Sequence, residues 1–459
     1  MMKSEVYISM NQYIKDTIET IYNRYDSQPE FVQAVEEFLL SIEPVVDKHP
    51  EYKKNDLLMR LISPERLFKF RVVWTDDEGN AHTNMGYRCQ FNGAIGPYKG
   101  GLRFQKNVNE SIIKFLAFEQ TFKNALTGMP IGGGKGGSDF DPAGKSESEI
   151  MRFCQSFMTA LYRYIGPDID VPAGDMGVSQ REIGYLFGQY RRLKGNFENG
   201  VLTGKGLSYG GSLIRPEATG YGAVYYLNEV LKHENDTLEG KRIGVSGYGN
   251  VAWGIMKKAA ELNAKVIYMS GPDGYIRDPD GISTEEKLNY ILEMRRIDPM
   301  HCKPYAEKFN CEFVPNKKFW GVSDVDIYMP AAVQNDVGFE AAKLIGDSGV
   351  KYYIEVANMP TTNDALSYLR SCEHIIVAPS KAVNAGGVGV SALEMSQNSE
   401  RLSWTAEEVD EQLHRMMKTI HDNSVKAAEE FGLGYDLVSG ANIAGFEKVA
   451  EAMLEQGLF

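Results

Sequence analysis

One stretch of about thirty residues constrains the fold of this chain most strongly. Residues 241–246 are predicted to form a strand, residues 250–262 a helix and residues 265–269 a second strand, with the sequence GYGNVA at the first turn. Strand, G-x-G-x-x-A, helix and strand is the context that a dinucleotide fingerprint requires. The helix N-terminus would offer its amide groups to a pyrophosphate. The sequence therefore predicts a Rossmann-like domain whose cofactor-binding residues include Gly247, Tyr248, Gly249, Asn250 and Val251.

The residue expected to read the cofactor ribose follows the second strand. Asp273 lies close to the usual spacing of about twenty residues after the fingerprint. A carboxylate there would accept a hydrogen bond from a free 2′-hydroxyl and repel a 2′-phosphate, which favours NAD. Arg277 is close enough in sequence to pair with a phosphate, so NADP stays possible. Asp273 is also the central residue of Pro-Asp-Gly, and a plain turn residue is the alternative interpretation.

A second informative stretch, residues 130–137, places Lys135 among five glycines. A lysine held in such a segment is a good acid/base candidate, because burial or neighbouring cations can lower its pKa. Lys99 and Lys123 precede it, and three converging cations would suit an anionic substrate. A phosphate-binding P-loop fits poorly, since Met129 stands at its first glycine and Gly136 at its hydroxyl position. A Gly-rich surface turn is the other alternative.

Residues 168–177 are rich in turn formers and carboxylates, with Asp175 between a glycine and a methionine. Asp175 is a candidate for proton transfer. Acidic turn residues are usually solvated, so a surface role is the competing interpretation.

The remaining pattern predicts two α/β regions. Apolar residues recur at helical spacing over residues 10–46, and strands at 68–74 and 83–91 are predicted to form a hairpin. Residues 110–126 are predicted to form a helix that carries Lys123 near its end. Strands at 352–357 and 375–378 would continue an open sheet, a glycine-dense loop follows at 384–391, and 405–431 is a long amphipathic helix. We expect an α/β fold with a substrate domain on a mixed sheet, a Rossmann-like domain and a cleft between them.

Composition narrows the partners. The formal net charge of −13 argues against general binding to nucleic acid or anionic membranes, but not against an anionic small molecule. The five cysteines are scattered without a C-x-x-C pair, so we expect a reducing cytoplasm, no disulfide framework and no metal site.

Long motifs then identify a family resemblance that covers nearly the whole chain from Tyr13 onward. PYKGGLRF, FEQTFKNALTGMPIGGGKGGSDF and VPAGDMGV occur in that order, followed by the fingerprint and the 384–391 segment. The chain resembles the hexameric glutamate dehydrogenases of the bacterial type. The resemblance implies reversible oxidative deamination of L-glutamate to 2-oxoglutarate and ammonia with NAD(P), and a homohexamer.

The resemblance also implies roles for individual residues. Lys135 would be the catalytic lysine, its pKa lowered by Lys99 and Lys123, and Asp175 would transfer protons. Lys99 with Ser391 would bind the side-chain carboxylate, and Lys123 the α-carboxylate. Further substrate contacts are implied at Gly100, Gln120, Ala173 and Val388, and cofactor contacts at Arg215, Thr219, Asn250, Asn358 and Asn384. Tyr248, Pro272 and Asp273 resemble the NAD-preferring members.

Two alternatives stay open at this point. A related leucine or phenylalanine dehydrogenase would share the chemistry, but an apolar side chain would not favour a buried Lys99. A catalytically silent nucleotide-binding regulator is the other. We expect residues 1–209, with 435–459 returning to them, to form the substrate-binding and oligomerisation domain, and residues 210–434 the dinucleotide-binding domain.

Overall fold

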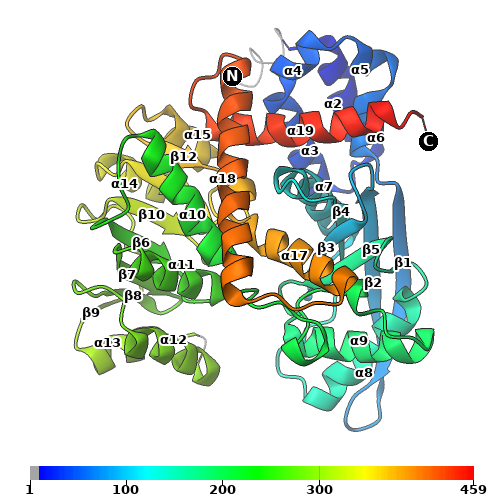
Figure 1. Ribbon diagram of the computed structural model, residues 1–459, viewed down its shortest axis with the longest axis horizontal. Coiled ribbons are helices and arrows are strands. Elements are labelled where there is room, and N and C mark those ends of the chain that lie inside the picture. Colours follow the sequence, from blue (N-terminus) through cyan, green and yellow to red (C-terminus); the bar gives the residue numbers. More distant parts are fainter. Residues whose placement is uncertain (1–9, 299, 459) are drawn as a thin grey trace.

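The computed structural model describes residues 10–298 and 300–458, and it contains two β-sheets flanked by helices. The two sheets lie side by side, with helices α17 (Gly386–Glu400) and α18 (Ala406–Glu430) between them (Figure 1). This is the predicted α/β class. The first nine residues of the predicted substrate domain lie outside the described residues.

The first sheet has five strands in the order β1-β2-β4-β3-β5. The outer pairs β1–β2 and β2–β4 are antiparallel, whereas β3 is parallel to both β4 and β5, so the sheet is mixed. The predicted hairpin is confirmed, and both of its strands are longer than predicted. The strands are β1 (Arg66–Thr75), β2 (Ala81–Asn92), β3 (Tyr98–Phe104), β4 (Gly132–Ser138) and β5 (Asp170–Gly174).

Three segments predicted as loops or turns are regular structure. The glycine-rich stretch around Lys135 is strand β4, and most of the segment before Asp175 is strand β5. Glycine is required in β4 and its neighbour β3 because the two strands and the segments around them pack too closely for a Cβ. One added at Gly100 would lie 1.6 Å from the Gly134 carbonyl oxygen. The 384–391 segment is also not a loop, since most of it is the start of helix α17.

Eight helices accompany this sheet in the described part of the chain. The helical spacing of residues 10–46 is divided among three of them, because Pro29 and Pro44 cannot donate a backbone hydrogen bond and each starts a new helix. The helices are α2 (Gln12–Arg24), α3 (Pro29–Ser41), α4 (Glu43–Lys48), α5 (Glu51–Lys54), α6 (Leu57–Ile62), α7 (Glu110–Leu126), α8 (Glu147–Leu161) and α9 (Gln180–Lys194).

The second sheet has seven strands in the order β12-β11-β10-β6-β7-β8-β9. Strands β12 to β7 in this order are parallel, as expected for a Rossmann-like sheet, and β8 and β9 add an antiparallel edge. The strands are β6 (Arg242–Ser246), β7 (Lys265–Gly271), β8 (Gly274–Arg277), β9 (Glu312–Pro315), β10 (Ile327–Pro330), β11 (Tyr352–Ile354) and β12 (Ile376–Ala378).

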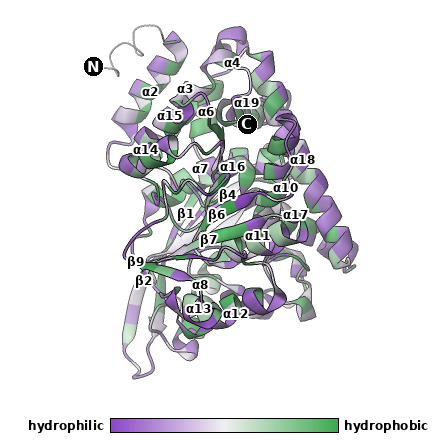
Figure 2. Cartoon of the chain, turned by 90° about the vertical axis from the view of Figure 1, so that its left-hand side faces the viewer, coloured by the Kyte–Doolittle hydropathy of each residue, from purple (hydrophilic) through white to green (hydrophobic). Residues whose placement is uncertain are grey.

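Helices cover both faces of this sheet, and its strands β6 and β7 are coloured largely hydrophobic in Figure 2. A short 3₁₀ pair, η1 (Asn199–Val201) and η2 (Leu207–Tyr209), leads into the region. The helices are α10 (Ala218–His233), α11 (Asn250–Glu261), α12 (Glu285–Ile297), α13 (Lys303–Phe309), α14 (Phe339–Asp347), α15 (Asn363–Ser371) and α16 (Ser380–Val383).

The chain then returns to the first sheet. Helix α18 begins with a capping box formed by Thr405 and Glu408, and α19 (Leu437–Glu455) crosses to the N-terminal helices (Figure 1). There Phe446 packs against Phe38, with ring centroids 6.3 Å apart. Within the described residues, none of the helices is both long and apolar enough to cross a membrane.

Candidate active site

A cavity of about 570 Å³ opens between the two sheets. It brings together residues from β3, β4, α7, β5 and the start of α17, which are far apart in the sequence. Fourteen of the site residues predicted from the sequence line it: Lys99, Gly100, Gln120, Lys123, Lys135, Ala173, Asp175, Arg215, Thr219, Val251, Asn358, Asn384, Val388 and Ser391.

The closest charged contact in this cavity joins Lys135 and Asp175. The Lys135 Nζ lies 2.7 Å from Asp175 Oδ2, and the Arg103 Nε donates to the same oxygen at 3.1 Å. Lys135 is in β4 and Asp175 directly follows β5, and both strands pair with β3. The parallel register of the three strands therefore places the ammonium and the carboxylate together.

Burial shifts the pKa values of both groups. Burial is the main cause that lowers the pKa of Lys135, with Arg103 and Arg88 adding to it and Asp175 opposing it. Burial is one of the predicted causes, whereas the main cationic neighbours are Arg103 and Arg88 and not the predicted Lys99 and Lys123. Burial alone would raise the pKa of Asp175, but Lys135 and Arg103 hold it below its ordinary range. Asp175 is therefore ionised and forms an ion pair with the Lys135 ammonium.

Lys99 is fully buried at one end of the cavity. Its Nζ donates to the Val171 carbonyl oxygen at 3.1 Å and to the Thr203 Oγ1 at 2.7 Å. Burial lowers the pKa of Lys99 well below its ordinary value, and the nearby Arg215 lowers it further. A carboxylate bound here would restore the charged form of the lysine.

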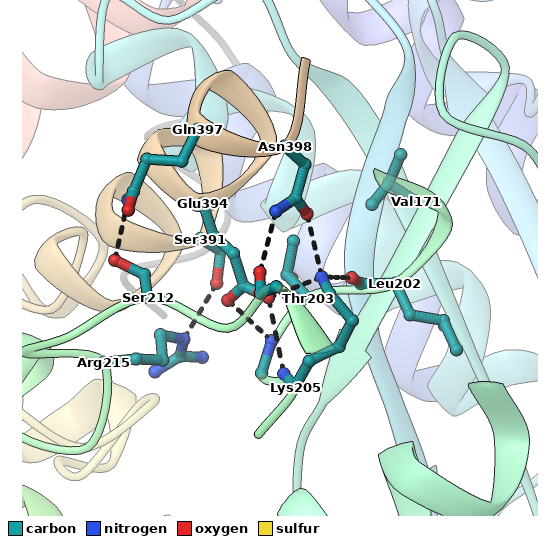
Figure 3. A network of polar contacts seen from close by, with 12 residues as sticks. Val171, Leu202, Thr203, Lys205, Ser212, Arg215, Ser391, Glu394, Gln397 and Asn398 are labelled. Carbon is teal, nitrogen blue, oxygen red and sulfur yellow. Dashed lines mark hydrogen bonds and ion pairs between the residues drawn. The ribbon is translucent and has the colours of Figure 1, made fainter. Parts of the chain in front are cut away.

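Arg215 and Ser391 lie at this same end. The Arg215 Nε donates to the Ser391 Oγ at 2.9 Å (Figure 3). Arg215 was predicted to contact the cofactor, and the structure places it beside the serine expected to bind substrate. Arg215, Ser391 and Lys99 together supply donors for an anionic group.

Lys123 reaches the cavity from the last turn of α7. Burial and the neighbouring Lys135 lower its pKa to about 8. Beside it, the Asn124 Nδ2 donates to the backbone oxygens of Lys99 at 3.0 Å and Gly132 at 2.6 Å, which ties α7 to the two lysine-bearing strands. The cavity is thus lined by three lysines, from β3, α7 and β4, that could bind an anionic molecule.

The fingerprint region has the local geometry of a dinucleotide site. Gly247 has a positive φ of 84°, and α11 begins at Asn250 after the N-cap Gly249. A Cβ added at Gly249 would meet nothing within 4 Å, so the space above this helix N-terminus is open. A pyrophosphate fits at such a terminus.

Asn384 supplies a second observation that fits a nicotinamide cofactor. Its Nδ2 donates to the Val356 carbonyl oxygen and to the Asn358 Oδ1, each at 2.9 Å. Its Oδ1 is buried and finds no donor among the described residues. A carboxamide group entering the cavity could supply that donor.

Five predicted cofactor residues are not part of the cavity lining: Gly247, Tyr248, Gly249, Asn250 and Asp273. The Asp273 carboxylate accepts from the backbone amides of Cys302 at 2.9 and 3.0 Å and of Lys303 at 3.1 Å, at the start of α13. Arg277, the alternative phosphate partner, donates to Asp324 at 2.8 Å. In this structure both candidate ribose readers have protein partners.

A buried polar network lies beside the cavity, and the sequence analysis did not predict it (Figure 3). Lys205 and Glu394 form an ion pair at 2.7 Å, and both side chains are completely buried. Asn398 accepts from Lys205 at 2.9 Å and donates to the Gly210 carbonyl oxygen at 2.7 Å. Arg103 and Thr203 were also missed. Arg103 stands in the YKGGLRF motif and was open to prediction, whereas the others have no local signal.

Gly386 and Gly387 lie at the start of α17, where this helix packs closely on α10. A Cβ at Gly386 would lie 2.5 Å from the Ala218 carbonyl oxygen, and one at Gly387 would lie 2.4 Å from the Thr219 Oγ1. The close contact between two helices accounts for both glycines.

Comparison with known proteins gives matches over almost the whole chain. The family model for Glutamate/Leucine/Phenylalanine/Valine dehydrogenase matches residues 210–457, and that for the Glu/Leu/Phe/Val dehydrogenase dimerisation domain matches residues 64–192. Metal-binding groups of three or more His, Cys, Asp or Glu side chains are not found in the part of the chain that the structure describes.

Individual relatives agree with the family models. The chain is 64% identical to the NAD-specific glutamate dehydrogenase of Clostridium symbiosum, over 98% of this chain and 100% of that protein. It is 54% identical to the NAD(P)-specific glutamate dehydrogenase of Xylanibacter ruminicola, over 97% of this chain and 99% of that one. A solved glutamate dehydrogenase structure superposes with a TM-score of 0.96 at 64% identity, covering 98% and 100% of the two chains.

Proposed function

Because the chain belongs to the Glu/Leu/Phe/Val dehydrogenase family, we propose that it catalyses the reversible oxidative deamination of L-glutamate to 2-oxoglutarate and ammonia. The cofactor is NAD(P), with NAD favoured. The observation that carries the proposal is the fully buried Lys99, which lines the same cavity as the Lys135–Asp175 pair. A buried ammonium favours an anionic side chain over the apolar one of leucine or phenylalanine.

Substrate binding is assigned to the ends of the cavity. Lys99 and Ser391 bind the side-chain carboxylate, and the placement of Arg215 on Ser391 supports a role for that arginine at the same end. Lys123 binds the α-carboxylate. Gly100, Gln120, Ala173 and Val388 line the space between. Two fixed carboxylates leave the α-carbon a single orientation, which is a large part of the rate enhancement expected from positioning.

The chemistry is assigned to Lys135 and Asp175. NAD, when bound, would supply the acceptor for the α-hydride of glutamate, and the side chains of the cavity act on the imine that results. Lys135, with its lowered pKa, takes a proton from the attacking water and stabilises the oxygen as charge develops. Asp175, 2.7 Å away, exchanges protons with Lys135 and with the departing ammonia.

Cofactor binding is assigned to the fingerprint and to the cavity wall beside it. Gly247, Tyr248, Gly249, Asn250 and Val251 hold the pyrophosphate region at the start of α11. Thr219, Asn358 and Asn384 face the nicotinamide end. Asp273 remains the proposed ribose reader and must then exchange its contacts with the backbone of α13.

We also propose the larger organisation. Residues 1–209 with 435–459 form the substrate-binding and oligomerisation domain, residues 210–434 form the dinucleotide-binding domain, and the protein works as a cytoplasmic homohexamer. Size-exclusion chromatography with light scattering checks the hexamer, and a monomer or dimer at assay concentration would contradict it.

The direct test of the activity is a substrate panel. The purified protein is given NADH or NADPH with ammonium and either 2-oxoglutarate or 4-methyl-2-oxopentanoate, and absorbance is followed. Of the four combinations, only NADH with 2-oxoglutarate and ammonium is expected to give rapid oxidation. Preference for 4-methyl-2-oxopentanoate would indicate a leucine dehydrogenase, and NADPH preference would overturn the assignment of Asp273. Dinucleotide binding without turnover would indicate the silent regulator.

A further inference from the structure

The Lys205–Glu394 ion pair has no part in the chemistry assigned above, yet it is one of the most deeply buried pairs in the described structure. Its two atoms are 2.7 Å apart, and both side chains have no exposed surface. Removing two charges from water is costly, and apolar residues of similar volume are often as stable or more so. A role in specificity is therefore worth testing.

The pair joins two segments of the chain that flank the cavity. Glu394, on α17, accepts from the backbone amides of Gly204 at 2.9 Å and Lys205 at 3.4 Å. The Lys205 Nζ also donates to the Leu202 carbonyl oxygen and to the Asn398 Oδ1. Figure 3 shows these contacts converging between α17 and residues 202–205.

Each of the two joined segments carries a group from the side-chain end of the cavity. Thr203, two residues before Lys205, accepts from the Lys99 Nζ at 2.7 Å. Ser391 precedes Glu394 by three residues, so it lies on the same face of α17. The contact between Lys205 and Glu394 therefore joins the segment that binds Lys99 to the helix that carries Ser391.

We propose that the Lys205–Glu394 pair is a specificity-determining positioning element, which holds Lys99 and Ser391 at the separation that accepts a side-chain carboxylate. The inference rests on the proposed function, and it adds two residues that do not touch the substrate. Selectivity for glutamate would then depend on the contact between α17 and residues 202–205 as well as on the side chains that touch the substrate.

The charges around Lys99 support this role. Burial, Arg215, Arg88 and Lys205 lower the pKa of Lys99, while Glu394 raises it. Glu394 thus favours the charged form of the lysine that would bind the carboxylate. Its replacement by a neutral residue should lower the pKa of Lys99 further and make the lysine a weaker anion binder at neutral pH.

The test uses Glu394→Gln and the double variant Lys205→Met with Glu394→Gln. The double variant removes both charges, so it is expected to fold even if the single variant, which leaves an unpaired buried lysine, does not. The measured quantity is the ratio of kcat/KM for L-glutamate to that for L-norvaline, whose side chain lacks the carboxylate. We expect the ratio to fall about tenfold or more in the double variant, through the KM for glutamate.

The pH profile gives a second readout. In a folded Glu394→Gln variant, kcat/KM for glutamate should decline at lower pH than in the wild type, whereas the norvaline profile should not move. Asp278→Asn is the matched control, because Asp278 pairs with Lys287 at 2.6 Å in the dinucleotide-binding region. Its selectivity ratio should equal that of the wild type.

The outcomes separate this inference from the proposed function. An unchanged selectivity ratio in the folded double variant would overturn the inference. Lys99→Met, assayed in parallel, tests the substrate assignment itself, because retained preference for glutamate there would overturn that assignment. Loss of selectivity in Lys99→Met but not in the double variant would leave the proposed function standing and remove only the role of the ion pair.

Discussion

The Lys135 ammonium and the Asp175 carboxylate lie 2.7 Å apart, although forty residues separate them in the sequence. Strand β3 pairs with both β4, which carries Lys135, and β5, which ends just before Asp175. The sheet therefore brings the two groups into an ion pair in which each shifts the pKa of the other. Arg103 binds the same carboxylate and keeps it ionised.

Replacing Asp175 by Asn tests this pair. The amide cannot accept a proton, and the pKa of Lys135 should fall further once its anionic neighbour is gone. We expect kcat for glutamate oxidation to fall by roughly 100-fold or more, the range of general acid–base catalysis. Initial rates with saturating NAD and glutamate measure it, with circular dichroism as the check of folding. A kcat close to that of the wild type would rule out the assigned role.

The pH dependence of substrate binding tests Lys123. Its pKa is lowered to about 8, chiefly by burial and Lys135, with Asp175 and Glu119 opposing and Arg215 assisting. Lys123 is charged below this pH and loses its charge above it, so the KM for glutamate should rise as pH increases past about 8. In Lys123→Gln the KM should be high already at pH 7 and should lack this rise. The same rise in Lys123→Gln as in the wild type would assign it to another group.

Glu355 gives a prediction on stability that is separate from catalysis. Burial raises its pKa from 4.5 to about 7, so the folded protein binds a proton more tightly than the unfolded chain. The stabilisation from this group is fully present below pH 4.5 and is lost as pH rises through 7. Glu355→Gln should therefore raise the free energy of unfolding at pH 8 by at most roughly 3 kcal/mol, with a higher melting temperature. At pH 5 the same substitution should change the stability little. Equal effects at the two pH values would contradict this interpretation.

The close packing of β3 on β4 can be tested with paired glycine substitutions. In Gly100→Ala the new Cβ would lie 1.6 Å from the Gly134 carbonyl oxygen, which requires the strands to separate. We expect the free energy of unfolding to fall by at least roughly 2 kcal/mol. We also expect glutamate turnover to be lost. Gly188→Ala is the control, because its Cβ meets nothing within 4 Å on helix α9. Thermal melts compare the two, and a stable, active Gly100→Ala would show that the strands can move apart.

The sequence was most informative where a function requires a particular residue within a short segment. The fingerprint at 247–252 and the lysine-bearing motifs could be recognised locally, and the structure brings fourteen of the predicted residues to one cavity. The secondary structure of the same motifs was less predictable. Glycine is usually a turn signal, but around Lys135 it allows a buried strand to pack against β3 and α7.

Residues recruited by tertiary contacts could not be predicted in this way. Thr203, Lys205 and Glu394 belong to no short motif, and they meet only because α17 packs beside residues 202–205. The pKa of Lys135 illustrates the same point. Its direction and the effect of burial followed from the sequence, but its main cationic neighbours are Arg103 and Arg88 and not the two lysines that stood out in the sequence.

The most direct test of the role assigned to Lys135 is the Lys135→Ala variant, assayed with NADH, 2-oxoglutarate and ammonium beside the wild type. We predict rapid NADH oxidation by the wild type and no measurable turnover by the variant. NADH binding, followed by fluorescence titration, and the melting temperature should stay close to wild-type values. Near-normal turnover in Lys135→Ala would contradict the assigned chemistry.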